Sequence, residues 1–440
     1  MRRTAALLLL ATLGVWPTTT GAASALRPAA PVERGGQAGA VVAQAPVPGT
    51  FATGYRAVAD SVPIHMAATP RLYGVLQPSV AHRARVWQAG IRLQTFELGW
   101  DAYEPTEEGW DTAYIQQQRD RLAGMRAVGF APVLDLGLQY PPAWLFTLPD
   151  SRFVNQYGDA YGDGPGTNGA NAVFNQAVRD RQARYIARVL RDLGGDFYAI
   201  RVGGGSYGEV GYPHPVFGGH DNGYWAYDRI AQGTAPGLPI GMTTAPIPGW
   251  HPGMASTNHV AAAVFVDWYL ASLQHYHDWQ IATVRRLYAG RIAVLYPSWG
   301  LRPGQLDEAI ADDLGGMTSA EINGEVQRGF DFARLVGAIN DPNVLVYTTW
   351  LDADDSGDTG ADRRNWSPVR YLAALADANA VHPRLWGENT GRGDLSAMQR
   401  SFRQMRSYNL LGLLWAFEPE LHGGGHASLS EYAALIEQAR

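Results

Sequence analysis

The chain has 440 residues, of which 46% are hydrophobic and 17% are charged, and its net charge is −6 at neutral pH. This length and composition exclude a disordered tail or a coiled coil, and the negative charge argues against nucleic acid as the main partner. The sequence has no cysteine. It also has no lysine, since all 35 residues counted as lysine or arginine are arginine. Thiol nucleophiles, thiolate metal sites, disulfides and Schiff-base chemistry are therefore excluded, and carboxylates, histidines, hydroxyls and arginines remain for catalysis.

The N-terminal segment is predicted to be a signal peptide over residues 1–25. Arg2 and Arg3 precede an apolar run to Val15, and Ala23-Ser24-Ala25 provides a cleavage site of small residues. Residues 26–50 are rich in Ala, Pro and Gly and are predicted to be a flexible spacer. No later run reaches about 18 apolar residues. We therefore expect an exported protein without a membrane span.

Short apolar runs alternate with amphipathic stretches from about residue 70 to the last residue. The predicted strands are Leu72–Gln77, Gly90–Phe96, Ala131–Leu136, Tyr198–Val202, Ile292–Tyr296, Val344–Thr348, Arg384–Trp386 and Leu410–Trp415. The predicted helices are Thr112–Val128, Val173–Leu193, Val260–Tyr288, Ile322–Ile339, Ser367–Asn379, Leu395–Tyr408 and Leu429–Gln438. This pattern predicts the α/β class: a single (β/α)8 TIM barrel over residues 51–440, with a long insertion after strand 4 at about residues 212–258.

Polar and aromatic residues cluster where the predicted strands end, which is the face on which TIM barrels place their active sites. Buried carboxylates are costly unless they are paired or functional, so several on one face indicate a functional site. The candidate substrate-binding residues are Glu97, Trp100, Asp101, Asp135, Tyr140, Tyr207, Tyr296, Trp299, Trp350, Asn389, Trp415 and Glu418.

Two glutamates are the candidate catalytic residues. Glu209 follows strand 4 in a glycine-rich segment from Val202 to Pro213, and Glu388 follows strand 7 between Gly387 and Asn389. In such a pair, one carboxyl group is held protonated and donates to a leaving oxygen, while the other is ionised. We assign the acid to Glu209 and the nucleophile or base to Glu388.

Two segments resemble the family 42 β-galactosidases. Residues 97–111 are similar to the segment after strand 2 of that family, and residues 141–158 are similar to its loop after strand 3. The resemblance is strongest over residues 90–215 and implies a retaining enzyme with Glu209 as acid/base and Glu388 as nucleophile. This chain has Gly208 where retaining enzymes of that clan place Asn.

The two glutamate segments also resemble β-amylases. Val202 to Pro213 is similar to their strand-4 motif V-G-x-G-x-x-G-E-x-x-Y-P, and Gly387-Glu388-Asn389 matches their strand-7 Gly-Glu-Asn. That resemblance implies an inverting enzyme in which Glu388 is the general base.

Together, these features predict an exported glycoside hydrolase that acts on an oligosaccharide or polysaccharide. The first choice is an exo-acting, retaining β-glycosidase of β-galactosidase type, and the alternative is an inverting, β-amylase-like enzyme. A carbohydrate-binding barrel without catalysis is the alternative from another class. No organic cofactor or metal site is predicted, and the acidic stretch from Asp352 to Asp362 is interpreted as a solvated loop. The sequence predicts no oligomeric state.

Overall fold

The computed structural model describes residues 70–162, 169–317, 320–391, 393–423 and 426–439. The predicted signal peptide, the spacer and residues 51–69 of the predicted barrel lie outside these described residues.

Eight parallel strands form the centre of the fold, as predicted. They are β1 (Leu72–Val75), β2 (Leu93–Glu97), β3 (Ala131–Asp135), β4 (Ala199–Val202), β5 (Arg291–Tyr296), β6 (Val344–Thr348), β7 (Leu385–Gly387) and β8 (Gly412–Trp415). Their order is β7-β6-β5-β4-β3-β2-β1-β8. A parallel bridge between Glu388 and Leu414 brings the two end strands together, so the sheet forms a nearly closed barrel.

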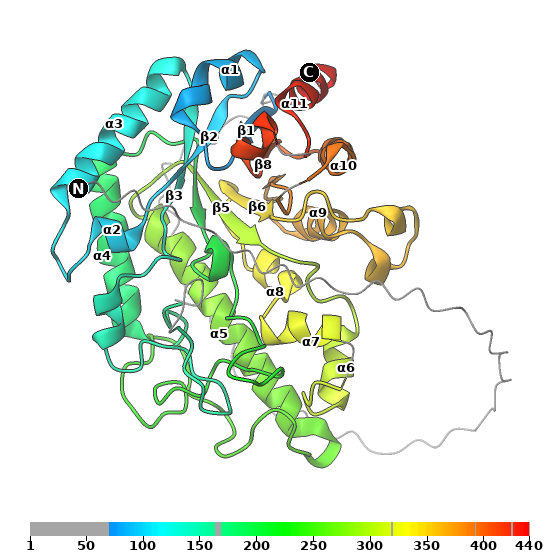
Figure 1. The fold of residues 1–440 in the computed structure, drawn as a ribbon. Coiled ribbons are helices and arrows are strands. Elements are labelled where there is room, and N and C mark those ends of the chain that lie inside the picture. Colours follow the sequence, from blue (N-terminus) through cyan, green and yellow to red (C-terminus); the bar gives the residue numbers. More distant parts are fainter. Residues whose placement is uncertain (1–69, 163–168, 318–319, 392, 424–425, 440) are drawn as a thin grey trace, which may run out of the picture. The chain divides into compact units, whose positions relative to one another are not determined.

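Helices follow every strand and surround the barrel (Figure 1). They are α1 (Arg83–Gln88), α2 (Trp100–Tyr103), α3 (Thr112–Val128), α4 (Gln176–Leu193), α5 (Val260–Arg285), α6 (Gln305–Ala311), α7 (Ala320–Gln327), α8 (Phe332–Gly337), α9 (Pro368–Ala378), α10 (Leu395–Ser407) and α11 (Leu429–Gln438). None of the described helices is both long enough and apolar enough to span a bilayer.

Local sequence signals explain where these helices begin and end. The side chain of Asp111 accepts a hydrogen bond from the Tyr114 N–H at the start of α3. Gly129 ends α3 in the left-handed region at φ 105°. Helix α4 begins in the same way, with the side chain of Asn175 accepting from the Val178 N–H.

The prediction of one helix over Ile322–Ile339 was wrong, because the structure has two helices there. Gly329, at φ 77°, breaks the segment between α7 and α8. The side chain of Asp331 then caps α8 by accepting a hydrogen bond from the Arg334 N–H. The missed signal was the sequence Arg328-Gly329-Phe330-Asp331, which combines a helix-ending glycine with an N-cap residue.

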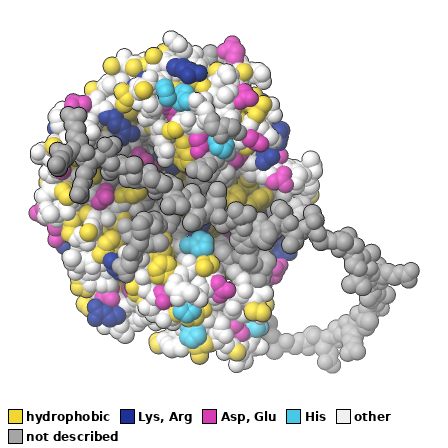
Figure 2. Space-filling model, viewed as in Figure 1, with side chains coloured by type: hydrophobic (Ala, Val, Ile, Leu, Met, Phe, Trp, Pro, Cys, Tyr) yellow, Lys and Arg dark blue, Asp and Glu magenta, His cyan; other side chains and the backbone are white. Residues whose placement is uncertain are grey.

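Residues 203–259 separate β4 from α5 and contain only two short 3-10 helices, η3 (Ser206–Gly208) and η4 (Thr257–His259). This segment packs against the loop after β3: the Tyr227 N–H donates to Val154 O at 2.9 Å, and the His220 ring contacts Asp159 at 2.8 Å. On the face drawn in Figure 2, the described acidic and basic side chains are interspersed rather than segregated by sign.

Candidate active site

The parallel register aligns charged side chains at the C-terminal ends of β2, β3 and β4. Glu97 pairs with Asp135, and Asp135 pairs with Arg201. Arg201 is only 5% exposed, and its Nε lies 3.6 Å from Oδ2 of Asp135. Burial opposes the charge of Arg201, but the nearby Glu388 and further acidic groups outweigh it and raise its pKa. A permanently charged guanidinium therefore lies under the mouth of the barrel.

Glu388 lies directly after β7 and contacts this guanidinium. Nη1 of Arg201 is 3.3 Å from Oε2 of Glu388, and Nη2 donates to Oε1 at 3.4 Å. The Tyr347 hydroxyl donates to Oε2 at 2.6 Å. Burial raises the pKa of Glu388, while Arg201 and the hydrogen bond from Tyr347 oppose that rise. Three donor contacts to one carboxyl group favour its ionised form.

Glu209 follows β4 in a different environment. Its Oε1 accepts a hydrogen bond from the Thr349 hydroxyl at 2.7 Å, and its Oε2 is 4.0 Å from Nη2 of Arg328. Burial raises the pKa of Glu209, and the charge of Glu388 raises it further, whereas Arg328 and Thr349 lower it. Glu209 has one short donor contact and a distant guanidinium, so of the two carboxyl groups it is better suited to carry a proton.

Glu97, Asp135, Gln139 and Tyr140 form one hydrogen-bonded group beside this pair. The Tyr140 hydroxyl donates to Oε1 of Glu97 at 2.8 Å. The Gln139 amide donates to Oδ1 of Asp135 at 3.2 Å and reaches Oε1 of Glu97 at 3.5 Å. Burial, followed by the charge of Asp135, raises the pKa of Glu97. Tyr140 is 44% exposed, so this group borders solvent and can meet a ligand.

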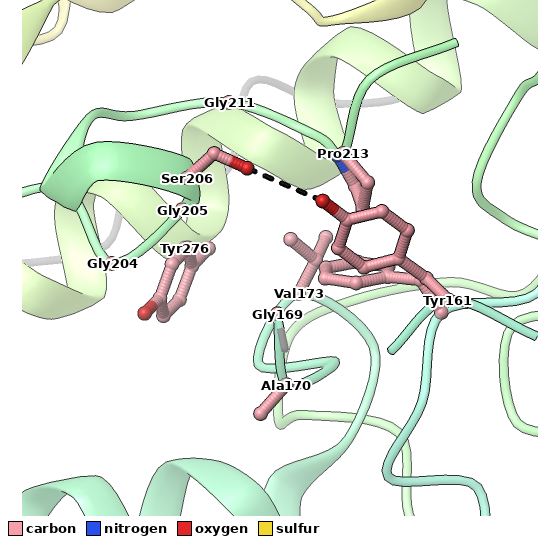
Figure 3. Close-up of a pocket in the computed structure, with 11 residues that line it drawn as sticks. Tyr161, Gly169, Ala170, Val173, Gly204, Gly205, Ser206, Gly211, Pro213 and Tyr276 are labelled. Carbon is pink, nitrogen blue, oxygen red and sulfur yellow. Dashed lines mark hydrogen bonds between the residues drawn. The ribbon is translucent and has the colours of Figure 1, made fainter. Parts of the chain in front are cut away.

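Glycines allow the backbone before Glu209 to fold back on itself. A Cβ on Gly203 would lie 2.1 Å from Gly208 O, and one on Gly205 would lie 2.7 Å from Glu209 O. A small cavity of about 10 Å³ lies beside this turn. That volume is about one water molecule. The Tyr161 hydroxyl and Oγ of Ser206, which point toward each other in Figure 3, are 3.5 Å apart. The turn that carries Glu209 is therefore tightly packed.

The variant Gly203→Ala tests this packing. Its Cβ must displace the Gly208–Glu209 backbone, so we expect a loss of about 1–3 kcal/mol of unfolding free energy and misplacement of the Glu209 carboxyl group. Chemical denaturation and an activity assay measure the two effects. Gly324→Ala is the matched control, because a Cβ there meets no atom within 4 Å. If the two variants had the same unfolding free energy and the same activity, the tight packing of this turn would be contradicted.

Four predicted substrate contacts lie in the core instead. Trp100, Tyr296, Asn389 and Trp415 are each at most 2% exposed. The Trp100 indole donates to Glu104, the Tyr296 hydroxyl pairs with His277, and the Asn389 amide donates to Ala416 O. The polar groups of these three residues are thus used inside the protein, and the burial of all four gives no surface to a sugar.

The other predicted contacts differ in their exposure. Tyr207, beside Glu209, is 80% exposed, and Asp101 is exposed and accepts a hydrogen bond from the Ala102 N–H. Trp350 is half-buried after β6. Trp299 is also half-buried and lines a cavity of about 550 Å³ together with Asp354 to Asn365. Glu418 is fully buried and groups with two histidines, His82 and His422, rather than with the residues described above.

Five residues of this site were not predicted, and they are Gln139, Arg201, Arg328, Tyr347 and Thr349. Arg201 offered a signal, because it is a charged residue inside the apolar strand Ala199–Val202, and burying an unpaired charge is costly. Tyr347 and Thr349 lie at the end of a predicted strand, where side chains reach the barrel mouth. Gln139 and Arg328 lie in loops and gave no signal.

Comparison with known proteins agrees with this architecture. No protein-family model and no curated protein matches the chain. The fold is similar to the catalytic domain of the β-amylase from Paenibacillus polymyxa, with a TM-score of 0.60 and 17% identity over 85% of this chain and 99% of that one. It is also similar to the β-galactosidase from Halorubrum lacusprofundi, with a TM-score of 0.54 and 14% identity over 84% of this chain and 58% of that one.

A third similar structure is the β-galactosidase from Bacillus circulans sp. alkalophilus, with a TM-score of 0.53 and 11% identity over 84% of this chain. The chain spans little more than half the length of the two β-galactosidases. The predicted TIM-barrel fold, of the kind found in these glycoside hydrolases, is therefore confirmed.

Proposed function

We propose that this chain hydrolyses O-glycosidic bonds, with Glu209 as the general acid and Glu388 as the nucleophile or base. The observation that carries the proposal is the contrast between the two carboxyl groups. Glu388 receives donors from Arg201 and Tyr347, whereas Glu209 receives one short hydrogen bond from Thr349. A proton donor and an ionised carboxylate are the two groups that glycoside hydrolysis needs.

In the proposed reaction, Glu209 transfers its proton to the leaving oxygen as the glycosidic bond breaks. In the retaining course, Glu388 attacks the anomeric carbon, and the ionised Glu209 then takes a proton from the water molecule that releases the sugar from Glu388. In the inverting course, Glu388 removes a proton from a water molecule that attacks the anomeric carbon directly. Its negative charge also stabilises the oxocarbenium-like transition state. Arg201 keeps Glu388 ionised and so acts as a positioning residue, while Glu97 and Tyr140 are proposed to bind sugar hydroxyls.

The β-amylase-like, inverting course, which was the alternative from the sequence, is proposed here as the first candidate. Its support is the turn around Gly208, which adopts φ 78° and precedes Glu209 within the segment that resembles the β-amylase motif. In addition, the chain spans nearly the whole β-amylase catalytic domain with which it was compared.

The retaining, β-galactosidase-like course is the second candidate. It is favoured by the Gln139 amide, because a Cβ on Gly208 would lie 3.4 Å from its Nε2. Gln139 can thus supply an amide close to where the retaining enzymes have Asn. Inverting enzymes keep their carboxyl groups about 6.5–9.5 Å apart, and retaining enzymes about 5–5.5 Å apart.

Cleavage from the chain end is part of the proposal. The segment after β4 and the loop after β3 are joined by hydrogen bonds, among them Tyr224 N–H to Oε1 of Gln156 at 2.8 Å. Together these two segments would close the β3–β4 side of the barrel mouth. A substrate site closed on one side favours an exo-acting enzyme over one with an open groove. Export through the predicted signal peptide stays a prediction, which N-terminal sequencing of the secreted protein would test.

A panel of aryl β-glycosides, aryl α-glycosides and soluble starch tests the proposed function. Proton NMR of the first-formed sugar separates the two courses: β-maltose from starch supports the inverting candidate, and a β-anomer from a β-galactoside supports the retaining one. Hydrolysis of none of these compounds, combined with sugar binding, would favour the non-catalytic barrel.

Thr349→Val tests the environment of the acid. The hydrogen bond from Thr349 lowers the pKa of Glu209, so its removal raises that pKa. The acid is active when protonated, and we therefore expect the alkaline limb of the kcat/KM profile to move to higher pH. Thr349→Ser keeps the hydroxyl and is expected to keep the wild-type profile. An unchanged alkaline limb in the valine variant would contradict the assignment of Glu209 as the acid.

A further inference from the structure

Two histidines and a glutamate meet where the first and last strands of the barrel pair. His82 ends η1 (Val80–His82) after β1, while Glu418 and His422 begin and end η7 (Glu418–His422) after β8. Strands β1 and β8 pair along their whole length, and the Glu418 N–H donates to Leu76 O at 3.0 Å. The backbone therefore brings together residues that lie more than 300 positions apart in the sequence.

The three side chains have the spacing of metal ligands. Nδ1 of His82 is 3.7 Å from Oε1 of Glu418, and Nε2 of His422 is 3.3 Å from the same oxygen. One ligand atom from each residue fits within 4.8 Å of the other two. Tetrahedral zinc with bonds of about 2.0–2.1 Å places its ligand atoms about 3.4 Å apart. The two measured distances, 3.7 Å and 3.3 Å, are close to that value.

Unsatisfied polar atoms within the cluster give an independent indication. Glu418 is 0% exposed, and its Oε2 has no hydrogen-bond partner among the described residues, although the Ser79 backbone N–H approaches the carboxyl group. Nδ1 of His82 is likewise buried without a hydrogen bond. Leaving a buried polar atom unsatisfied costs about 1–3 kcal/mol, and a cation bound by Nδ1 of His82 and by both carboxylate oxygens of Glu418 would remove that cost.

The donor set and the local charge select the type of ion. Two imidazoles and one carboxylate suit zinc and other first-row transition metals, whereas calcium and magnesium prefer oxygen ligands. Arg83 and Arg85 contribute positive charge near Glu418 and His422. Weakly bound cations are therefore disfavoured, and an ion needs strong bonds to nitrogen to remain there.

We propose that His82, Glu418 and His422 bind one divalent transition-metal ion, best fitted by Zn²⁺, which links the loops after β1 and β8. Three protein ligands leave a fourth tetrahedral position for water. The three ligands are different residues from the proposed acid and base, and the test measures metal binding directly, so it does not depend on whether the chain hydrolyses glycosides.

The test is zinc binding by the purified full-length chain without a histidine tag. After treatment with a chelator and its removal, the protein is titrated with ZnCl₂, and bound metal is measured by calorimetry and elemental analysis. We expect one Zn²⁺ per chain and a thermal midpoint that rises on metal addition. His422→Ala and Glu418→Gln are each expected to weaken binding by about tenfold or more. His251→Ala, which changes an exposed histidine elsewhere, is the matched control and should bind like the wild type.

A second measurement keeps the test independent of folding defects. Cobalt(II) added to the wild-type chain should give the visible absorption bands of a four-coordinate ion, and these should be absent in His82→Ala. Near-UV circular dichroism establishes that each variant is folded. The proposal is overturned if the folded wild type binds no Zn²⁺, or if folded His422→Ala and Glu418→Gln bind it as tightly as the control.

Discussion

Replacing Glu388 by Gln is expected to lower kcat/KM by about 10⁴-fold, the upper end of what general base catalysis contributes. The amide cannot attack the anomeric carbon or take a proton from water. It also removes the negative charge that faces Arg201, although its shape is nearly that of the carboxylate. The measurement is steady-state hydrolysis of the best substrate found in the panel.

Two further variants make this result specific. Glu209→Gln should cause a loss of similar order on substrates that need a proton on the leaving group, because the amide cannot donate as an acid. Glu437→Gln changes an exposed carboxyl group in α11 and should keep wild-type activity. If folded Glu388→Gln retained activity within tenfold of wild type, Glu388 would not be a catalytic residue.

Replacing Arg201 by Met is expected to cost about 3–5 kcal/mol of unfolding free energy. The guanidinium lies between Asp135 and Glu388 and is only 5% exposed. Removing it leaves two carboxyl groups at a buried site without their shared counter-charge. Urea denaturation followed by circular dichroism at neutral pH measures the loss.

The pH dependence of this loss follows from the same charges. Without Arg201, the pKa of Glu388 rises further, since Arg201 opposes the effect of burial. Such a carboxyl group has a higher pKa in the folded chain than in the unfolded chain. It favours the folded state at pH values below its unfolded pKa, and this contribution to the unfolding free energy is lost as the pH rises through its folded pKa. The stability deficit of Arg201→Met should therefore shrink in mild acid.

Arg403→Met is the matched control for a charged pair outside the core. Arg403 contacts Asp355 through two hydrogen bonds of 2.8 Å, but its side chain is 52% exposed. Exposed pairs contribute about 0–1 kcal/mol, so this variant should lose little stability. Equal losses for Arg201→Met and Arg403→Met would show that the buried network does not stabilise the fold.

The barrel was predictable because its strands are short apolar runs with distinct ends. Helix α3 has the predicted bounds, Thr112–Val128, since Asp111 and Gly129 mark its two ends. The positions of Glu209 and Glu388 at the ends of β4 and β7 also follow from the strand pattern alone.

Side-chain direction was not predictable in the same way. Trp415 ends β8 and Trp100 begins α2, yet both side chains are buried, because the face that a residue occupies follows from the backbone geometry of its strand or helix and not from its place near the barrel mouth. The partners of the two glutamates depend on register between strands that are distant in sequence. The pairing of Asp135 with Arg201, for example, exists only once β3 and β4 are aligned.

The cluster of His82, Glu418 and His422 shows the same limit over a longer range. His422 and Glu418 are four residues apart, which is a spacing that a sequence scan can find. The third member, His82, joins them only because the barrel pairs its first strand with its last.

The most direct test of the two-glutamate account is the leaving-group dependence of Glu209→Ala. Wild type and variant would be compared on aryl glycosides of one sugar, with leaving groups that range from good to poor. If Glu209 is the acid, the variant should lose about 10²–10⁴-fold on poor leaving groups and far less on good ones. An equal loss on every leaving group, or no loss at all, would contradict the assignment of Glu209 as the acid.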